Sequence, residues 1–258
     1  MESFADWTQP FAWAFVQAFP TPGALQQAGK RAWEKFLHRH KLWRPDTAPQ
    51  RLAAWAQGQQ LNASPAIVNA KSLLADSLAC VLQSLQKQID EYRARIRAAF
   101  QAHPDHEIFG HLPGAQDKLA PRLLAELGSQ REVFPDAQSL LCYAGVSPVS
   151  FQSGQIRKAH IRWACDHFLR HTVHLWANQS RIRCPWAQAY YQAKRDKGHS
   201  HASALRCLGK RWLKLLWRLW QDHLTYNESV HLQSLRTHGS FVAKLLALPS
   251  PPLTAPGE

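Results

Sequence analysis

The chain has 258 residues, of which 45% are hydrophobic and 11 are tryptophan, so it can bury a substantial core and is not a disordered protein. No apolar run approaches 18 residues, and the first residues are acidic where a secretory signal would be basic, so we expect a cytoplasmic protein without a membrane partner. The five cysteines form no C-x-x-C pair and the 14 histidines have no spacing typical of a metal site, so we expect neither a disulfide framework nor metal ligands.

The positive charge is concentrated in one part of the chain. Residues 151–220 contain 14 Lys or Arg and two Asp, which gives this stretch a net charge of +12 out of +13 for the whole chain. Such asymmetry is typical of a surface that binds phosphate groups. We therefore expect nucleic acid as the partner of this region.

The first 60 residues are predicted to form short amphipathic helices that prolines interrupt. Thr21-Pro22-Gly23 indicates a helix start, because proline is favoured at the first helical position. The aromatic residues of this region are Trp7, Phe11, Phe15, Phe19, Trp33, Phe36, Trp43 and Trp55. We interpret them as a packing core, with a base-stacking platform as the alternative.

One long helix is predicted from Ser64 to His103, because neither glycine nor proline occurs after Pro65. Its apolar residues follow steps of three and four, at Ile67, Ala70, Leu74, Leu78, Val81, Leu85, Ile89, Tyr92, Ile96 and Phe100. An 11-residue repeat of this kind keeps the stripe on one side of a nearly straight helix. At about 60 Å the helix would exceed a globular core, so we predict a coiled-coil-like arm that associates through residues 64–103. The alternative is a long helix that lies on its own domain.

An element that resembles a helix-hairpin-helix follows this helix. It consists of the turn Leu112-Pro113-Gly114-Ala115 and a helical stretch over 119–128. The backbone amides of such a hairpin can bind phosphate, so Pro113 and Gly114 are candidate nucleic-acid contacts. Gln116 stands where a second glycine is usual, so plain helix packing is an equal alternative.

The rest of the chain is predicted to be helical, apart from a turn at Gly145 to Pro148 and a loop beyond it that carries Ser153. Helices are expected over about 160–178, 186–197 and 200–224, and the last presents Lys210, Arg211 and Lys214 opposite its apolar face. The fold class is therefore mainly α. The predicted regions are a helical connector (1–60), a long coiled-coil-like helix (61–103), a C-terminal domain (104–248) and a flexible tail (249–258).

The stretch from Tyr143 to Lys158, with Arg162, Asp166 and Leu169-Arg170 after it, resembles the C-terminal domain of bacterial insertion-sequence transposases of the families one-ten, one-sixteen and nine-oh-two. That family carries a nucleophilic serine in a Ser-Gly step after a Gly-x-x-Pro turn. The resemblance implies that Ser153 is the nucleophile and that Gly145, Pro148 and Gly154 shape its loop. The cations near it in sequence, which we expect to bind phosphate, are Arg157, Lys158, Arg162 and Arg170.

The resemblance also implies a function, namely DNA transposition by serine-mediated strand cleavage and rejoining, guided in the family by an RNA. In the family a coiled coil and a RuvC-like domain precede the serine domain, and Asp-Glu-Asp-Asp carboxylates in that domain hold magnesium. We find no such carboxylate pattern before residue 100, so we expect no cofactor in this chain, Mg²⁺ only with the missing domain, and no cleavage by the chain alone. Asp166 is the one acid close enough in sequence to serve as a lone base.

The partners implied are DNA, a guide RNA, and either a second copy or a full-length transposase bound through residues 64–103. The alternative function is a non-catalytic nucleic-acid-binding remnant, or a dimerisation partner of a full-length transposase.

Overall fold

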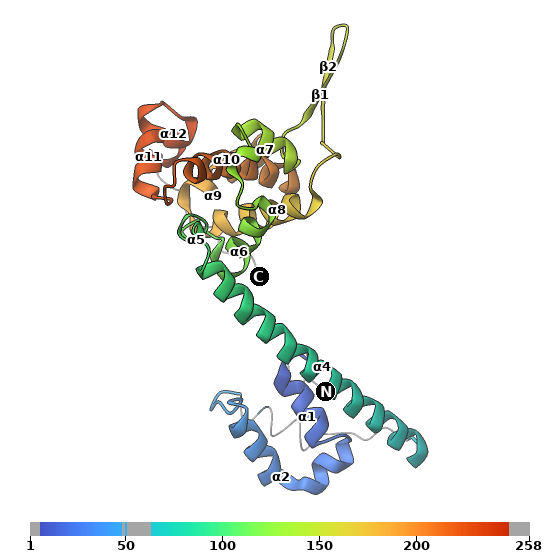
Figure 1. The fold of residues 1–258 in the computed structure, drawn as a ribbon. Coiled ribbons are helices and arrows are strands. Elements are labelled where there is room, and N and C mark those ends of the chain that lie inside the picture. Colours follow the sequence, from blue (N-terminus) through green and yellow to red (C-terminus); the bar gives the residue numbers. More distant parts are fainter. Residues whose placement is uncertain (1–5, 48–49, 51–62, 248–258) are drawn as a thin grey trace. The chain divides into compact units, whose positions relative to one another are not determined.

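The computed structural model describes residues 6–47, 50 and 63–247, and these residues are mostly helical, which confirms the mainly α fold (Figure 1). The chain divides into two compact units, Met1–Arg95 and Ile96–Glu258. The long helix α4 (Pro65–Gln101) contributes to both units. The predicted tail, 249–258, lies outside the described residues, and the predicted division into regions stays a prediction.

The first unit contains α1 (Pro10–Ala18), α2 (Pro22–Arg39) and most of α4. Helix α2 begins as predicted, with Pro22 in its first turn and the Thr21 hydroxyl accepting a hydrogen bond from the Ala24 amide at 3.0 Å. The buried side chains of this unit are mainly aromatic: Phe15, Phe19, Leu25, Trp33, Phe36 and Leu37. For the aromatic residues among them, this packing confirms the interpretation as a core; Trp55 lies outside the described residues.

Helix α4 has nearly the predicted bounds. In the first unit, however, the covered side of the helix is not the side that carries the apolar stripe. Gln17 of α1 donates a hydrogen bond to Cys80 Sγ (3.1 Å) and accepts one from Gln83 Nε2 (2.6 Å), and Ala79 beside them is 3% exposed. The stripe residues Ile67, Leu74, Leu78, Val81, Leu85, Ile89 and Tyr92 are between 45% and 64% exposed. The predicted stripe is therefore not covered by the described helices of its own unit.

Helix α4 is also the described helix whose length and composition would allow it to cross a membrane, with an 18-residue window of mean hydropathy 1.3. This finding rests on length and composition alone. An apolar stripe that associates with another helix produces the same signal, and the charged residues Lys71 and Asp76 lie in the first half of the helix.

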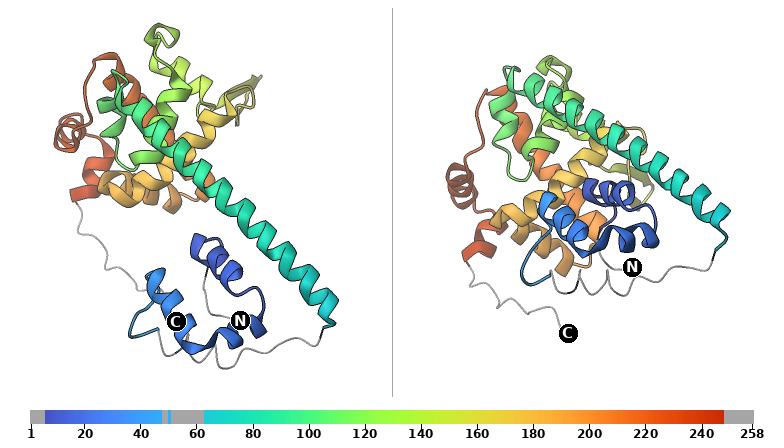
Figure 2. Two further views of the ribbon diagram at one scale, coloured as in Figure 1. Left: turned by 60° about the horizontal axis from the view of Figure 1, so that its bottom comes forward. Right: turned by 90° about the horizontal axis from the view of Figure 1, so that it is seen from below.

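The second unit is a bundle of helices with one two-stranded hairpin. Its elements are α5 (His106–Gly110), α6 (Gln116–Leu127), the 3₁₀ helix η1 (Arg131–Val133), α7 (Ala137–Tyr143), β1 (Val149–Ser153), β2 (Ile156–His160), α8 (His167–Arg183), α9 (Pro185–Asp196), α10 (His201–Gln221), α11 (Glu228–Thr237) and α12 (Phe241–Ala247). Helices α8, α9 and α10 pack against one another, with α6 on α8 and α7 on α10, as the three views show (Figures 1 and 2).

Four fully buried tryptophans form the centre of this bundle, and each donates its indole N–H to a partner. Trp176 donates to the Pro113 carbonyl (3.0 Å), Trp186 to the Tyr226 hydroxyl (2.9 Å), Trp212 to Ser180 Oγ (2.7 Å) and Trp220 to Asp105 Oδ2 (3.0 Å). A buried N–H without a partner would cost about 1–3 kcal/mol, so these bonds fix which way each large ring points. The bundle is therefore a specific scaffold for the surface residues described next.

Candidate nucleic-acid interface and candidate catalytic serine

Ser153 lies at the tip of an exposed β-hairpin, where the sequence predicted a loop. Strands β1 and β2 pair antiparallel, with Val149 opposite His160 at the base and Ser153 opposite Ile156 at the tip. Gly154 and Gln155 form the turn between them, and Gly154 has φ +57°. All five residues of β1 are exposed, and the hairpin extends away from the helices of its unit (Figure 1).

The hairpin separates Ser153 from part of the cation set that the sequence grouped with it. Arg157 and Lys158 are in β2, with their backbones opposite Gln152 and Phe151; their side chains are not described. Arg162 and Arg170 come after the base of the hairpin. Four residue steps at about 3.3 Å each place the base roughly 13 Å from the tip, so these two arginines do not lie beside Ser153.

Asp166 does not serve as a free base either. It caps helix α8, where its Oδ1 accepts a hydrogen bond from the Leu169 amide at 2.7 Å and its Oδ2 accepts one from the Tyr143 hydroxyl at 3.3 Å. Burial raises the pKa of Tyr143, and the neighbouring Asp166 carboxylate raises it further. Asp166 is thus a structural residue at the start of α8.

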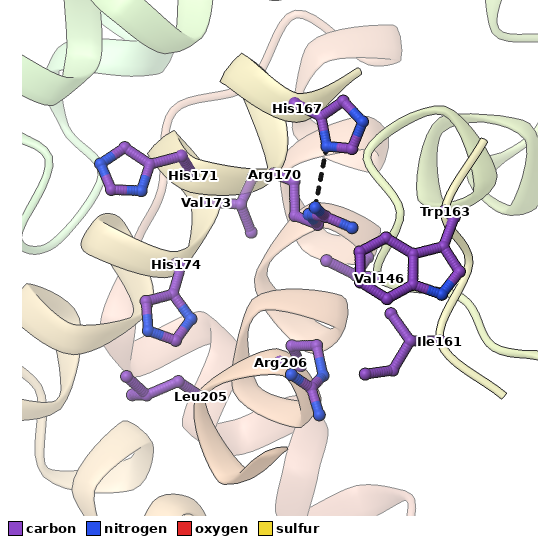
Figure 3. Close-up of a pocket in the computed structure, with 10 residues that line it drawn as sticks. All are labelled: Val146, Ile161, Trp163, His167, Arg170, His171, Val173, His174, Leu205 and Arg206. Atoms are coloured by element: carbon purple, nitrogen blue, oxygen red, sulfur yellow. Dashed lines mark hydrogen bonds between the residues drawn. The ribbon is translucent and has the colours of Figure 1, made fainter. Parts of the chain in front are cut away.

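A pocket of about 450 Å³ lies near the base of the hairpin (Figure 3). One side of α8 supplies most of its polar lining, because residues three and four apart point the same way on a helix. These are His167, Arg170, His171 and His174. Trp163, from the segment before α8, and Arg206, from α10, complete the charged and aromatic lining.

The pocket lining is cationic and carries no carboxylate among the ten residues drawn in Figure 3. The Arg170 guanidinium lies over the Trp163 ring, 5.9 Å from its centroid, and its Nη2 is 2.8 Å from His167 Nδ1. Burial lowers the pKa of His174, and the neighbouring His201, Arg206 and His171 lower it further. The lowered pKa favours the neutral His174 ring, so the permanent positive charges of this lining are those of Arg170 and Arg206.

The cationic surface continues from this pocket along α10. A second pocket shares Val146, Ile161 and Arg206 with the first and also takes in Arg162 and Lys210. A third pocket shares Cys207 and Lys210 with the second and reaches Lys214 and Arg218. We call this row of three pockets the basic track; its cations are Arg162, Arg170, Arg206, Lys210, Arg211, Lys214 and Arg218.

The three nucleic-acid contacts that were predicted on α10 differ in how accessible their side chains are to a phosphate group. Lys214 is exposed and Lys210 is half-buried, and both line the basic track. Arg211 is packed instead: its guanidinium lies over the rings of Tyr190 (5.2 Å) and Phe241 (6.0 Å), and its Nη2 donates to Ser240 Oγ at 3.2 Å. Burial lowers the pKa of this arginine. Arg211 therefore holds α12 to α9 and α10 rather than lying free for phosphate.

The turn at Pro113 and Gly114 is packed against α8, which favours the packing alternative over phosphate binding. Gly114 is buried with φ +79°, and a Cβ there would come within 2.6 Å of the Ser180 backbone nitrogen. The Pro113 carbonyl accepts the Trp176 N–H described above. Gly114 is thus needed for a close approach between backbones inside the protein, and its contact with nucleic acid stays a prediction.

The turn at Gly145 is likewise fixed by packing. A Cβ at Gly145, where φ is +66°, would come within 2.5 Å of Cys165 Sγ. Gly145 and Pro148 line the second pocket of the basic track, so this turn joins α7 to the hairpin at the edge of the cationic surface. Among the described residues, no group of three or more His, Cys, Asp or Glu is placed to hold a metal ion.

Trp163, His167 and Arg206 line the pocket but were not predicted as site residues from the sequence. The spacing of His167, Arg170, His171 and His174, at steps of three, one and three, was the signal that could have found the cationic side of α8. Arg206 had no such local signal, because only the packing of α10 on α8 brings it to the pocket.

Comparison with known proteins connects this surface to a family. Residues 106–192 match the model of the transposase IS116/IS110/IS902 family, and this segment contains the hairpin, Ser153 and most of the first pocket. The chain is 32% identical over 218 residues to an uncharacterised 42 kDa protein of insertion element IS900 from Mycobacterium paratuberculosis, covering 82% of this chain and 53% of that protein. It is 30% identical over 224 residues to a candidate transposase of the IS117 mini-circle from Streptomyces coelicolor, covering 86% and 54%.

A third relative is an uncharacterised 44.8 kDa protein of insertion element IS116 from Streptomyces clavuligerus, 29% identical over 205 residues, with 79% of this chain and 51% of that protein covered. The chain spans about half the length of these curated relatives. Residues 106–192 of this chain are therefore similar to the transposase domain of the IS116/IS110/IS902 family.

Proposed function

We propose that this chain is the serine-bearing part of an insertion-sequence transposase, which cuts and rejoins DNA strands through a phosphoserine link. The observation that carries the proposal is the position of Ser153, exposed at the tip of a hairpin within the segment that matches the family. A nucleophile in this position can reach a phosphodiester in a DNA duplex without moving the helical core.

In the proposed step, Ser153 Oγ attacks the phosphorus and loses its proton, and the bond from phosphorus to one strand's oxygen breaks. That oxygen leaves with a proton, and the phosphate stays on the serine. A hydroxyl of a second DNA end then attacks the same phosphorus and returns Ser153 to its free form. One phosphodiester is exchanged for another, so no external energy source is needed.

A serine hydroxyl needs a base or a metal ion to become nucleophilic. Asp166 is occupied as a helix cap, and the described residues offer no metal-holding group. In the proposal an Asp-Glu-Asp-Asp domain outside the described residues would hold Mg²⁺, which would help to activate the serine hydroxyl.

The basic track would bind the DNA backbone, since its cations line pockets that run from α8 along α10. The exposed Lys214 suits a phosphate contact, whereas the exposed Arg218 already forms an ion pair with Asp222 at 2.5 Å. Arg157 and Lys158 on β2 are further candidates. A guide RNA, as the resemblance implies, would present the same phosphate charge to this surface. Residues 64–103 would join two copies, or this chain and a full-length transposase, through the stripe of α4.

The test is a search for a covalent protein–DNA adduct. The chain is incubated with DNA that carries the junction of an insertion sequence, with and without a magnesium-loaded Asp-Glu-Asp-Asp domain of a relative, and the products are separated on a denaturing gel. We expect an adduct only in the complete mixture, and its loss in Ser153→Ala. The matched control is Ser150→Ala, also exposed on β1, which should keep the adduct. An adduct that survives Ser153→Ala would eliminate this serine as the nucleophile.

A second candidate function is nucleic-acid binding without catalysis, as a remnant or as a dimerisation partner. It is favoured by the separation of Ser153 from Arg162 and Arg170 along the hairpin. In that case the adduct is missing from every mixture while binding to DNA persists.

A further inference from the structure

We propose that the pocket formed by Trp163, Arg170 and Arg206 binds one unpaired nucleotide of a nucleic-acid strand, with the base on the Trp163 ring and the phosphate between the two arginines. The inference rests on the proposed function, because it names what one part of the basic track recognises. It adds a base-binding element to a surface that would otherwise contact only the sugar-phosphate backbone.

Trp163 is an exposed tryptophan. Its side chain is 72% exposed, whereas Trp176, Trp186, Trp212 and Trp220 are completely buried. A single exposed ring needs no explanation by itself. Trp163 differs because it lines a pocket of about 450 Å³ and already has a guanidinium over its ring.

Basic side chains share the pocket with the Trp163 ring. In the view of Figure 3, Trp163 stands at one side of the pocket, His171 and His174 at the other, and Arg170 and Arg206 between them. None of the lining residues carries a negative charge. Arg170 contacts His167 and the Trp163 ring, and its Nη1 donates a hydrogen bond to the Arg162 carbonyl at 3.3 Å, but no carboxylate of the lining neutralises it. The pocket therefore combines a flat apolar face with an anion site, which is the chemistry of a nucleotide.

A paired base and an unpaired base differ in whether their faces are accessible to the Trp163 ring. In a duplex the faces of each base are covered by their neighbours, so a protein ring can stack only on a base that has left the stack or belongs to a single strand. A basic surface without aromatic groups would show no such preference, because it reads phosphate alone. An acidic peptide could use the cations but gains little from the ring face.

The experiment measures affinity by fluorescence anisotropy with oligonucleotides of about 12 nucleotides, the size range of a small single-strand site. Four strands of equal phosphate number are compared: a DNA strand, an RNA strand, a DNA strand made of abasic sites, and a duplex. The full chain is used together with Trp163→Ala, Trp163→Phe and Phe168→Ala. Phe168 is the matched control, because it is 73% exposed at the start of α8 and does not line the pocket.

We expect Trp163→Ala to weaken binding of a single strand about 10-fold, since one base stacked on an aromatic side chain contributes about 1–3 kcal/mol. Trp163→Phe should keep most of the affinity, and Phe168→Ala should keep all of it. The abasic strand and the duplex should bind equally well to the wild type and to Trp163→Ala. A loss for either the DNA or the RNA strand supports the site, and the larger loss identifies the source of the nucleotide.

Several outcomes would overturn the inference. Equal losses in Trp163→Ala and Phe168→Ala would show a general effect of exposed rings, and an equal loss for the abasic strand would show that no base is bound. A polyglutamate peptide whose affinity fell as much in Trp163→Ala would identify a protein ligand. If no strand binds at low salt, the proposed nucleic-acid function fails as well, whereas binding of the abasic strand and duplex with no effect of Trp163 leaves that function intact.

Discussion

Helices α4 and α10 show the same kind of apolar periodicity in sequence but have opposite surroundings. On α10, Leu205, Leu208, Trp212 and Leu216 are at most 1% exposed, because α7, α8 and α9 cover them. On α4 the stripe residues of the first unit are about half exposed, and the covered side is the one that carries Ala79 and Gln83. Apolar spacing thus predicts which side of a helix avoids water, but not whether the chain itself supplies the cover.

The largest expected effect tests the covered helix. Trp212→Ala should lower the free energy of unfolding of the second unit by about 3–5 kcal/mol, because it leaves a cavity and removes the hydrogen bond to Ser180. Urea unfolding followed by circular dichroism measures this. The control is Trp163→Ala, which removes the same side chain from the surface and should change the free energy by less than about 0.5 kcal/mol. Equal losses would contradict the contrast between buried and exposed rings.

A smaller effect depends on pH and concerns His231 of α11, whose ring lies 4.9 Å from that of Trp186. Burial, together with the charge of Arg211, lowers the pKa of His231 to about 4, so the folded state favours the neutral ring. Its contribution to stability is present above pH 6.5, the ordinary pKa, and is lost as the pH falls toward 4. After allowance for solvent screening at a half-buried site, we expect a loss of roughly 1–2 kcal/mol over this interval.

His231→Phe keeps a ring beside Trp186 and removes the titration, so its stability should vary less between pH 6.5 and 4 than that of the wild type. The exposed His238→Phe is the control and should follow the wild type. Urea midpoints at several pH values make the comparison. Parallel curves for all three proteins would show that His231 does not cause the acid sensitivity.

The smallest effect on folding is expected on α4, where Leu85→Asp should change the free energy of unfolding by no more than about 0.5 kcal/mol. Its effect should appear in association instead, because a charge in an apolar seam has no partner. Sedimentation at micromolar concentrations should show an oligomer for the wild type and a monomer for the variant. Asn69→Asp introduces the same charge on the opposite side of the helix, about 160° around the axis from Leu85. This variant should still associate. A monomeric wild type would contradict the proposed seam.

Local signals in the sequence predicted the helices well, while contacts between distant segments were harder to foresee. The start of α2 at Pro22 and the bounds of α4 followed from proline and glycine positions. The role of Gly114 did not, because it depends on the approach of Ser180, far along the chain. The hairpin did have a signal that was missed: Val149 and Phe151 alternate with polar residues before a Ser-Gly turn, but a two-stranded sheet with no core offers few apolar residues to notice.

The exposure of the whole β1 strand has an evolutionary consequence. Because its side chains contribute nothing to a core, most substitutions in the hairpin should cost little folding energy, and selection on this segment would act through chemistry alone. Loss of Ser153 would leave a folded protein with its basic track intact. Under the proposed function, a chain that has lost Ser153 would still occupy the same nucleic acid and would compete there with the active protein.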